Sequence, residues 1–270
     1  MIRFRFGLTP LARVLPWGGQ EPGQEPRLHW FGLTDGWYWI ELGDGRELLR
    51  YSPRTVARLR QGPGAVVSHP YVDYYVARFW EDLALLTPAV TQPVPAGLLP
   101  FLVSGHDDWP PQDGWSEAAW TAAIWHDEHS LNLGYLRPAP RVRAWRTEAA
   151  GCDLVTLTWR QPAEGEDEKE LSFADPAGTV TSPAGAFQDA VRRLDRELLA
   201  AMGERVAELE RDGPPAGVRV DLDQLRAEHE DRKTWLARRA DRIPDTDWPA
   251  VRAGAAELLA GPGTGVRRPP

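Results

Sequence analysis

The sequence contains a single cysteine, Cys152, among its 270 residues. One thiol cannot form an internal disulfide bond, so the oxidised scaffold of small secreted domains is excluded. Zinc sites that need two thiolates are excluded as well, including zinc fingers, zinc ribbons and the zinc-deaminase signature. Because Cys152 opens a predicted strand with no cationic neighbour in the sequence, we expect a buried, unreactive thiol.

Long hydrophobic runs and net positive charge are also missing. No run approaches the ~18 apolar residues of a membrane span, and Arg3, Arg5 and Arg13 interrupt the region where a signal peptide would be apolar. The 31 Lys and Arg residues stand against 39 Asp and Glu residues, which gives a net charge of −8. We therefore expect a cytoplasmic protein that binds neither nucleic acid nor membrane.

The sequence is otherwise that of a globular α+β protein, with 42% hydrophobic residues and 13 tryptophans. Alternation of apolar and polar residues predicts a half-buried strand over residues 2–8. Asp35-Gly36 and Gly43-Asp44-Gly45 separate three further aromatic-rich segments, a pattern typical of hairpins. We expect these segments to form a three-stranded antiparallel meander over residues 28–32, 37–42 and 46–51.

The middle of the chain combines two predicted helices with a second antiparallel strand set. The first helix is expected to begin at Ser68-His69-Pro70 and to end before Pro88. The second begins at Ser116, and its apolar spacing places Trp120, Ala123 and Ile124 in the core. The predicted strands cover residues 141–146, 153–160 and 168–174, with Arg141, Arg143 and Arg146 on solvated faces.

The C-terminal third is predicted to be helical, with one long amphipathic helix over residues 183–211. Further helices are expected to begin after Asp221 and Asp247, whose side chains suit N-caps. Gly and Pro residues predict a disordered tail at 261–270. We expect residues 1–260 to form one α+β domain with antiparallel meanders packed by amphipathic helices. Its sub-regions are a meander plus helix (1–114), a helix plus antiparallel strands (115–182) and a helical region (183–260).

The stretch Trp125-His126-Asp127-Glu128-His129 carries the strongest chemical pattern. His126 and His129 lie three residues apart, so they share a helix face and could bind one metal ion. His106 and Asp107 repeat the His-Asp doublet of His126 and Asp127, which invites comparison with the metal-dependent phosphohydrolases that use such doublets. The simpler interpretation is favoured, namely hydrogen-bonded or solvated histidines at a polar helix end and a loop-capping aspartate.

The tryptophans offer a second candidate site. Trp30, Trp37 and Trp39 lie on neighbouring predicted strands, and exposed indoles can stack on sugar rings or cations. Large aromatic side chains are also common in cores, and we favour that role for the three, as for Trp80 and Trp120 on their helix stripes.

The segment Leu28-His-Trp-Phe-Gly-Leu-Thr-Asp-Gly-Trp-Tyr-Trp-Ile40 resembles an actinobacterial family known as domain of unknown function 5984. The similarity extends through His129-Ser-Leu131 and the Pro244–Trp248 stretch. It implies one intact module in a bacterial cytoplasm. Since that family has no assigned activity, the resemblance assigns no catalytic residue. It also makes an enzymatic function less favoured than a binding function.

We therefore expect a non-enzymatic module that binds another protein, of a regulatory or immunity type, with no cofactor. The first alternative is a metal-dependent hydrolase that uses His126 and His129 with Asp127, His106 or Asp107 nearby, and it alone requires a divalent metal. The second is a carbohydrate or small-ligand binder that uses Trp30, Trp37 and Trp39. The sequence leaves the oligomeric state open.

Overall fold

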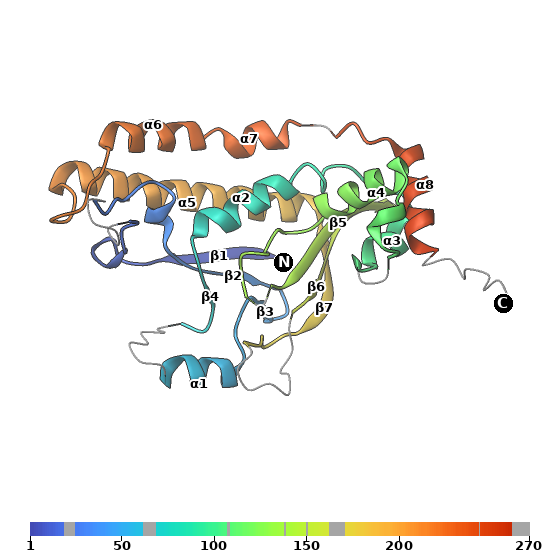
Figure 1. The fold of residues 1–270 in the computed structure, drawn as a ribbon, viewed down its shortest axis with the longest axis horizontal. Coiled ribbons are helices and arrows are strands. Elements are labelled where there is room, and N and C mark those ends of the chain that lie inside the picture. Colours follow the sequence, from blue (N-terminus) through green and yellow to red (C-terminus); the bar gives the residue numbers. More distant parts are fainter. Residues whose placement is uncertain are drawn as a thin grey trace.

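The computed structural model describes residues 1–18, 25–61, 69–106, 109–137, 139–149, 151–161, 171–242 and 244–260. Within these ranges the fold is α+β, with two antiparallel sheets, packing helices and a helical C-terminal region (Figure 1). The predicted tail at 261–270 lies outside the described residues.

The first sheet is built around one central strand, β2 (Gly36–Glu41). β1 (Arg3–Leu8) pairs antiparallel with one edge of β2 along its whole length. β3 (Glu47–Leu48) and β4 (Val72–Asp73) both pair with the other edge of β2. Tyr38 and Ile40 are fully buried on the core face, whereas Trp37 and Trp39 are half-buried on the outer face. Successive side chains of β2 therefore alternate between the core and the outer face, as expected for a strand.

The predicted meander is wrong at its first strand. Residues 28–32 form a turn that leads into a 3-10 helix at Gly32–Thr34, and β2 takes β1 as its partner instead. Trp30, Leu33 and Thr34 are all fully buried. A helical turn buries positions three and four residues apart, which a strand of period two cannot do.

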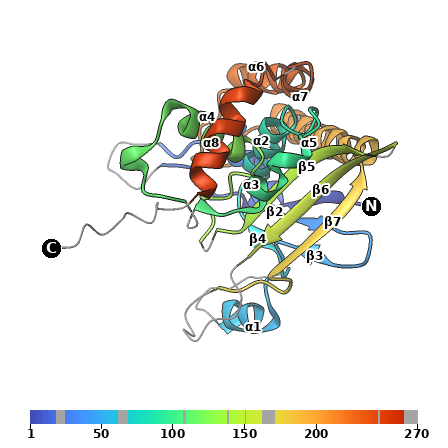
Figure 2. The same cartoon turned by 90° about the vertical axis from the view of Figure 1, so that its right-hand side faces the viewer.

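The second sheet has the order β5 (Arg141–Ala149), β6 (Cys152–Arg160) and β7 (Ala177–Pro183), and the three strands lie side by side in Figure 2. The third strand was predicted at 168–174 and instead begins at Ala177. Of the predicted segment, residues 168–170 lie outside the described residues. Cys152 is exposed at the start of β6, so the prediction of a buried thiol is wrong. The first residues of β6 extend beyond the core and are exposed to solvent.

The long helix α5 (Ala184–Asp212) packs on both sheets. The predicted helix had nearly the same bounds, and its apolar stripe is buried as expected: Phe187, Ala190, Val191, Leu194, Leu198, Met202, Val206 and Leu209. α6 (Leu222–Arg232) and α7 (Trp235–Ala240) follow above α5 in Figure 1. Among the described residues, none of the helices combines the length and hydrophobicity needed to cross a lipid bilayer.

The first predicted helix begins later in the chain than expected. Val72 pairs with Tyr38 in the first sheet, so β4 occupies the predicted first turn, and α2 runs over Val76–Leu86. Its end before Pro88 is confirmed, while Ser68 lies outside the described residues. α1 (Pro53–Gln61), which the sequence analysis did not predict, precedes β4.

A second hydrophobic core lies at one end of the molecule, between α3 (Leu99–Val103), α4 (Glu117–Glu128) and α8 (Trp248–Leu259). The predicted N-caps are confirmed: Ser116 accepts a hydrogen bond from the Ala119 amide, and Asp247 accepts one from the Ala250 amide. Asp221 caps α6 in the same way.

The predicted inward face of α4 is wrong for its two bulky residues. Trp120 is 44% exposed and Ile124 is 60% exposed. α4 turns its small residues Ala119 and Ala122 inward instead. A Cβ atom on Gly254 of α8 would lie 1.9 Å from the Ala118 carbonyl oxygen, so the two helix backbones touch at this glycine.

The first core contains a buried guanidinium group. Arg232 is 6% exposed, and its guanidinium carbon lies 4.1 Å from the ring centroid of Trp30 and 4.4 Å from that of Trp235. Glu81 and Glu228 each lie 2.8 Å from one of its nitrogens. These contacts tie α6 and α7 to α2.

Asp82 of α2 is a buried carboxyl group. It is 2% exposed, and Arg78 Nη2 lies 3.3 Å from its Oδ1. Burial raises the pKa of Asp82 to about 7, and the nearby Arg78 limits the rise. In the unfolded chain this carboxyl group has the ordinary aspartate pKa of ~3.9. The folded protein therefore holds this proton more tightly, and its stability falls as the pH rises from about 4 to about 7.

We expect Asp82→Asn to remove this pH-dependent loss, because asparagine has a similar shape and does not ionise. Relative to the variant, the wild type should lose roughly 3–4 kcal/mol of unfolding free energy across that window. Urea denaturation from pH 4.5 to 8 measures it, with Asp189→Asn on the exposed surface of α5 as the control. Parallel stability curves for wild type and Asp82→Asn would refute the assignment.

Candidate metal centre

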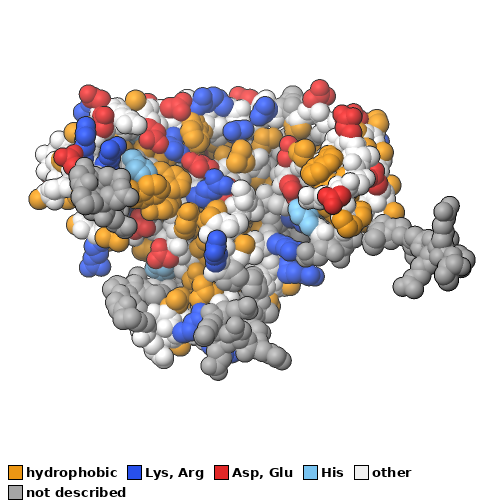
Figure 3. All heavy atoms as spheres, in the orientation of Figure 1, with side chains coloured by type: hydrophobic (Ala, Val, Ile, Leu, Met, Phe, Trp, Pro, Cys, Tyr) orange, Lys and Arg blue, Asp and Glu red, His pale blue; other side chains and the backbone are white. Residues whose placement is uncertain are grey.

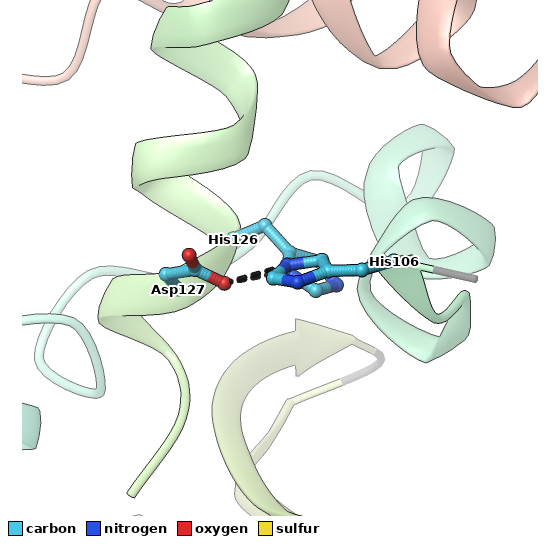
Figure 4. A group of neighbouring side chains, drawn as sticks. All are labelled: His106, His126 and Asp127. Carbon is cyan, nitrogen blue, oxygen red and sulfur yellow. Dashed lines mark hydrogen bonds and ion pairs between the residues drawn. The ribbon is translucent and has the colours of Figure 1, made fainter. Parts of the chain in front are cut away.

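Three side chains with metal-ligating atoms meet beside the second core (Figure 4). His126 and Asp127 belong to the last turn of α4, and His106 reaches them from the chain that follows α3. His106 Nε2 lies 2.9 Å from Asp127 Oδ1, and His126 Nδ1 lies 3.3 Å from the same oxygen. One ligand atom from each residue lies within 4.8 Å of the other two.

Arg143 of β5 holds together the segments that carry these ligands. Its Nη1 donates to the carbonyl oxygens of Leu102 at 2.9 Å and Ser104 at 2.6 Å, just before His106. Its Nε donates to Ser130 Oγ at 3.2 Å, just after α4. The prediction of a solvated arginine at this position is therefore wrong, because its side chain lies between two loops and bonds with both.

His126 is fully buried, and both of its ring nitrogens face oxygen atoms. Nε2 lies 3.3 Å from the Ser104 carbonyl oxygen, while Nδ1 faces Asp127 Oδ1. Burial lowers the pKa of His126, whereas the hydrogen bond with Asp127 acts to raise it. The effect of burial is larger, so the neutral ring is favoured. A neutral imidazole donates one hydrogen only, so the lone pair of its other nitrogen points at an oxygen atom. A cation between Nδ1 and the carboxylate would turn that repulsion into attraction.

The donor set suits a divalent transition metal. Zinc ligands lie ~2.0–2.1 Å from the ion, so the edges of a tetrahedral site are roughly 3.3 Å long, close to the separations around Asp127 Oδ1. Two imidazoles and one carboxylate bind Zn²⁺ or Fe²⁺ more readily than Ca²⁺ or Mg²⁺. The side chains of His106 and Asp127 are 52% and 56% exposed, which leaves one side of the cluster open.

Among the described residues, His129 is not part of the group formed by His106, His126 and Asp127. His129 follows the last residue of α4, is 2% exposed and has its Nδ1 2.8 Å from the Trp125 carbonyl oxygen. Burial lowers the pKa of His129 to about 4, so it is a neutral core residue that donates to the helix end. Asp107, the other predicted neighbour, lies outside the described residues.

Two hollows meet at the exposed members of the cluster. One has a volume of about 560 Å³ and is lined by Ser130, Asn132, Arg141 and Arg143 among others. The other has a volume of about 340 Å³, and its walls include Trp109, Trp115, Trp120 and Ile124. Both lining sets contain His106 and Asp127. A ligand in either hollow would therefore lie next to the cluster.

The three candidate tryptophans do not form one exposed surface. Trp30 is fully buried, and its Nε1 donates to His229 Nδ1 at 3.2 Å. The other two, Trp37 and Trp39, are on the outer face of β2, where their rings stack at 4.2 Å on His69 and Tyr71. The core interpretation is confirmed for Trp30, and a stacking surface made by all three indoles is ruled out.

The sequence analysis named His106 as a possible neighbour of His126 and Asp127, but it missed the role of Arg143. The repeated His-Asp doublet was the available signal, but nothing local indicates that the chain after α3 returns to the end of α4. Arg143 gave no signal, because its partners are backbone carbonyls in a distant loop.

A family model described as a family of unknown function, DUF5984, matches residues 3–254. No match was found among curated proteins or among solved structures. The matched range contains His106, His126 and Asp127 and reaches Gly254 of α8. The resemblance inferred from the sequence is thereby confirmed, and the chain belongs to the DUF5984 family, whose function is unknown.

Proposed function

We propose that this protein binds a divalent transition-metal ion through His106 Nε2, His126 Nδ1 and Asp127 Oδ1, and that it is a metal-dependent hydrolase. The observation that carries the proposal is the buried His126, whose two ring nitrogens both face oxygen acceptors at 3.3 Å beside a third ligand. A metal ion accepts the Nδ1 lone pair and neutralises the carboxylate at once.

The number of ligands supports a reactive site rather than a structural one. Structural zinc sites close the coordination shell with four protein ligands, whereas catalytic sites use three and keep a position for water or substrate. Among the residues that the structure describes, three candidate ligands lie beside two hollows. In such a site the ion acidifies its water and polarises the substrate, which is the chemistry of metal-dependent hydrolysis.

Metal analysis and titration of the full-length protein with Zn²⁺ or Co²⁺ test the proposal. We expect one ion to bind per chain. At a free metal concentration 100 times the Kd, the free energy of unfolding should rise by about 2.7 kcal/mol. His106→Ala and Asp127→Asn change exposed side chains, so both should fold and bind the metal at least ~10-fold more weakly.

The control is His69→Ala, a half-buried histidine that stacks on Trp37 of the first sheet and is not part of the cluster, so this variant should bind metal like the wild type. If Zn²⁺, Co²⁺, Mn²⁺ and Fe²⁺ all leave the melting temperature unchanged and none binds stoichiometrically, the proposal fails. Equal affinities for wild type and both cluster variants would also overturn it, because the ion would then bind elsewhere.

A second candidate function is the recognition of another protein without catalysis. It is favoured by the half-buried column of stacked rings on the outer face of the first sheet, formed by Trp37, His69, Tyr71 and Trp39. Planar aromatic groups of this kind are enriched in protein interfaces. A purified protein that binds no metal ion would favour this candidate.

A further inference from the structure

The two hollows beside the metal cluster differ in chemistry. The larger one carries the guanidinium groups of Arg141 and Arg143 and polar side chains from Ser130 and Asn132. The smaller one is mainly aromatic and apolar. On the face shown in Figure 3, hydrophobic and acidic side chains gather at the right-hand end of the molecule, with Lys and Arg side chains next to them.

The larger hollow is suited to an anion. Its described lining residues include two arginines and one carboxylate, Asp127, and a divalent ion at the cluster would add two further positive charges. This local excess contrasts with the chain's net charge of −8. Arg143 commits Nη1 and Nε to protein acceptors, and its Nη2 has no hydrogen-bond partner in the described part of the chain. Guanidinium groups bind phosphate and carboxylate oxygens in well-defined geometry.

The smaller hollow is suited to an aromatic ring. The Trp115 and Trp120 rings meet edge to face, with centroids 4.8 Å apart, and Trp109 lies 5.9 Å from Trp115. Trp120 and Ile124 are the two bulky residues that α4 leaves exposed. Leaving such side chains in water is unfavourable, and an aromatic ligand seated against them would recover part of that free energy.

We propose that the ligand of this site is an aromatic compound with an acidic group, either a phosphate or a carboxylate. The acidic group would lie with Arg141 and Arg143 and the ring with Trp115 and Trp120. His106 and Asp127 line both hollows, so such a ligand would lie next to residues that would hold the metal ion. This inference rests on the proposed metal-binding function for its metal contact, whereas the arginines and tryptophans act without the ion.

Calorimetric titration of the Zn²⁺-loaded protein with phenyl phosphate, benzoate, inorganic phosphate and phenol tests the inference. We expect phenyl phosphate or benzoate to bind at least ~10-fold more tightly than inorganic phosphate and than phenol. Whichever of the two aromatic anions binds more tightly shows whether the ligand carries a phosphate or a carboxylate.

Two exposed residues separate the contributions of the hollows. Trp120→Ala should weaken phenyl phosphate binding about tenfold and leave inorganic phosphate binding unchanged. Its control is Trp17→Ala, which has the same 44% exposure elsewhere on the surface. Arg141→Gln should weaken both anions about tenfold, with Arg192→Gln on the exposed surface of α5 as the control.

The outcomes distinguish the two proposals. If the metal binds but phenyl phosphate and benzoate bind no more tightly than inorganic phosphate, the ligand inference is overturned and the metal site stands. If no metal binds, the titrations are repeated on the metal-free protein. Loss of aromatic anion binding on Trp120→Ala and Arg141→Gln then supports the ligand inference alone, and unchanged binding in both variants overturns it.

Discussion

Replacing Gly254 with valine is expected to lower the free energy of unfolding by about 3 kcal/mol. Even the first added carbon would lie 1.9 Å from the Ala118 carbonyl oxygen and 2.8 Å from the Ala119 amide nitrogen. These are backbone atoms of α4, so no side chain can rotate away to make room. The helices must move apart, and the contacts of Val251, Ala255 and Leu258 with the second core are weakened.

The matched control is Gly185→Ala in α5, where an added Cβ meets nothing within 4 Å. Alanine favours helix over glycine by up to ~1 kcal/mol, so this variant should be as stable as the wild type or slightly more. Chemical denaturation measures both. The valine variant should also bind metal more weakly, because α4 carries His126 and Asp127. Wild-type stability in Gly254→Val would show that α4 and α8 do not touch at this glycine.

Replacing Arg232 with methionine is expected to lower the free energy of unfolding by about 3–4 kcal/mol. Methionine fills similar volume but leaves the carboxylates of Glu81 and Glu228 without their partner in a largely buried place. The stacking of the guanidinium between Trp30 and Trp235 is lost too. Arg232→Lys retains the charge but not the planar group, so it should recover only part of the loss.

Arg226 offers a matched control on the same helix. It also contacts two carboxylates, those of Glu210 and Asp223, but its side chain is 51% exposed against 7% for Arg232. Exposed ion pairs contribute little because water and salt screen them, so Arg226→Met should change the stability by less than ~0.5 kcal/mol. Equal losses in the two variants would contradict the buried role assigned to Arg232.

The features that the sequence predicted well depend on nearby residues. The N-caps at Ser116, Asp221 and Asp247 are formed within four residues of each helix start, and the α5 stripe repeats over one helix. The features that failed depend on distant partners. Nothing in the sequence around Gly36 indicates that β2 pairs with the first strand of the chain rather than with residues 28–32.

The candidate metal centre shows the same division. His126 and Asp127 were identified because they are adjacent on a helix. His129 was chosen as their partner from helical spacing, but α4 ends at Glu128 and the His129 ring turns to the Trp125 carbonyl. The third member, His106, is brought in by Arg143, whose hydrogen bonds join segments about 40 residues apart.

The contact between α4 and α8 also sets the order in which the site can be completed during synthesis. Ser116, the N-cap of α4, bonds through its amide and hydroxyl to the Glu257 carboxylate, 141 residues later. All three proposed ligands have left the ribosome long before α8 is made. Since domains fold as their segments emerge, the first core can form while α4 still lacks its neighbour. The metal centre should therefore be among the last parts of the protein to become ordered on the ribosome.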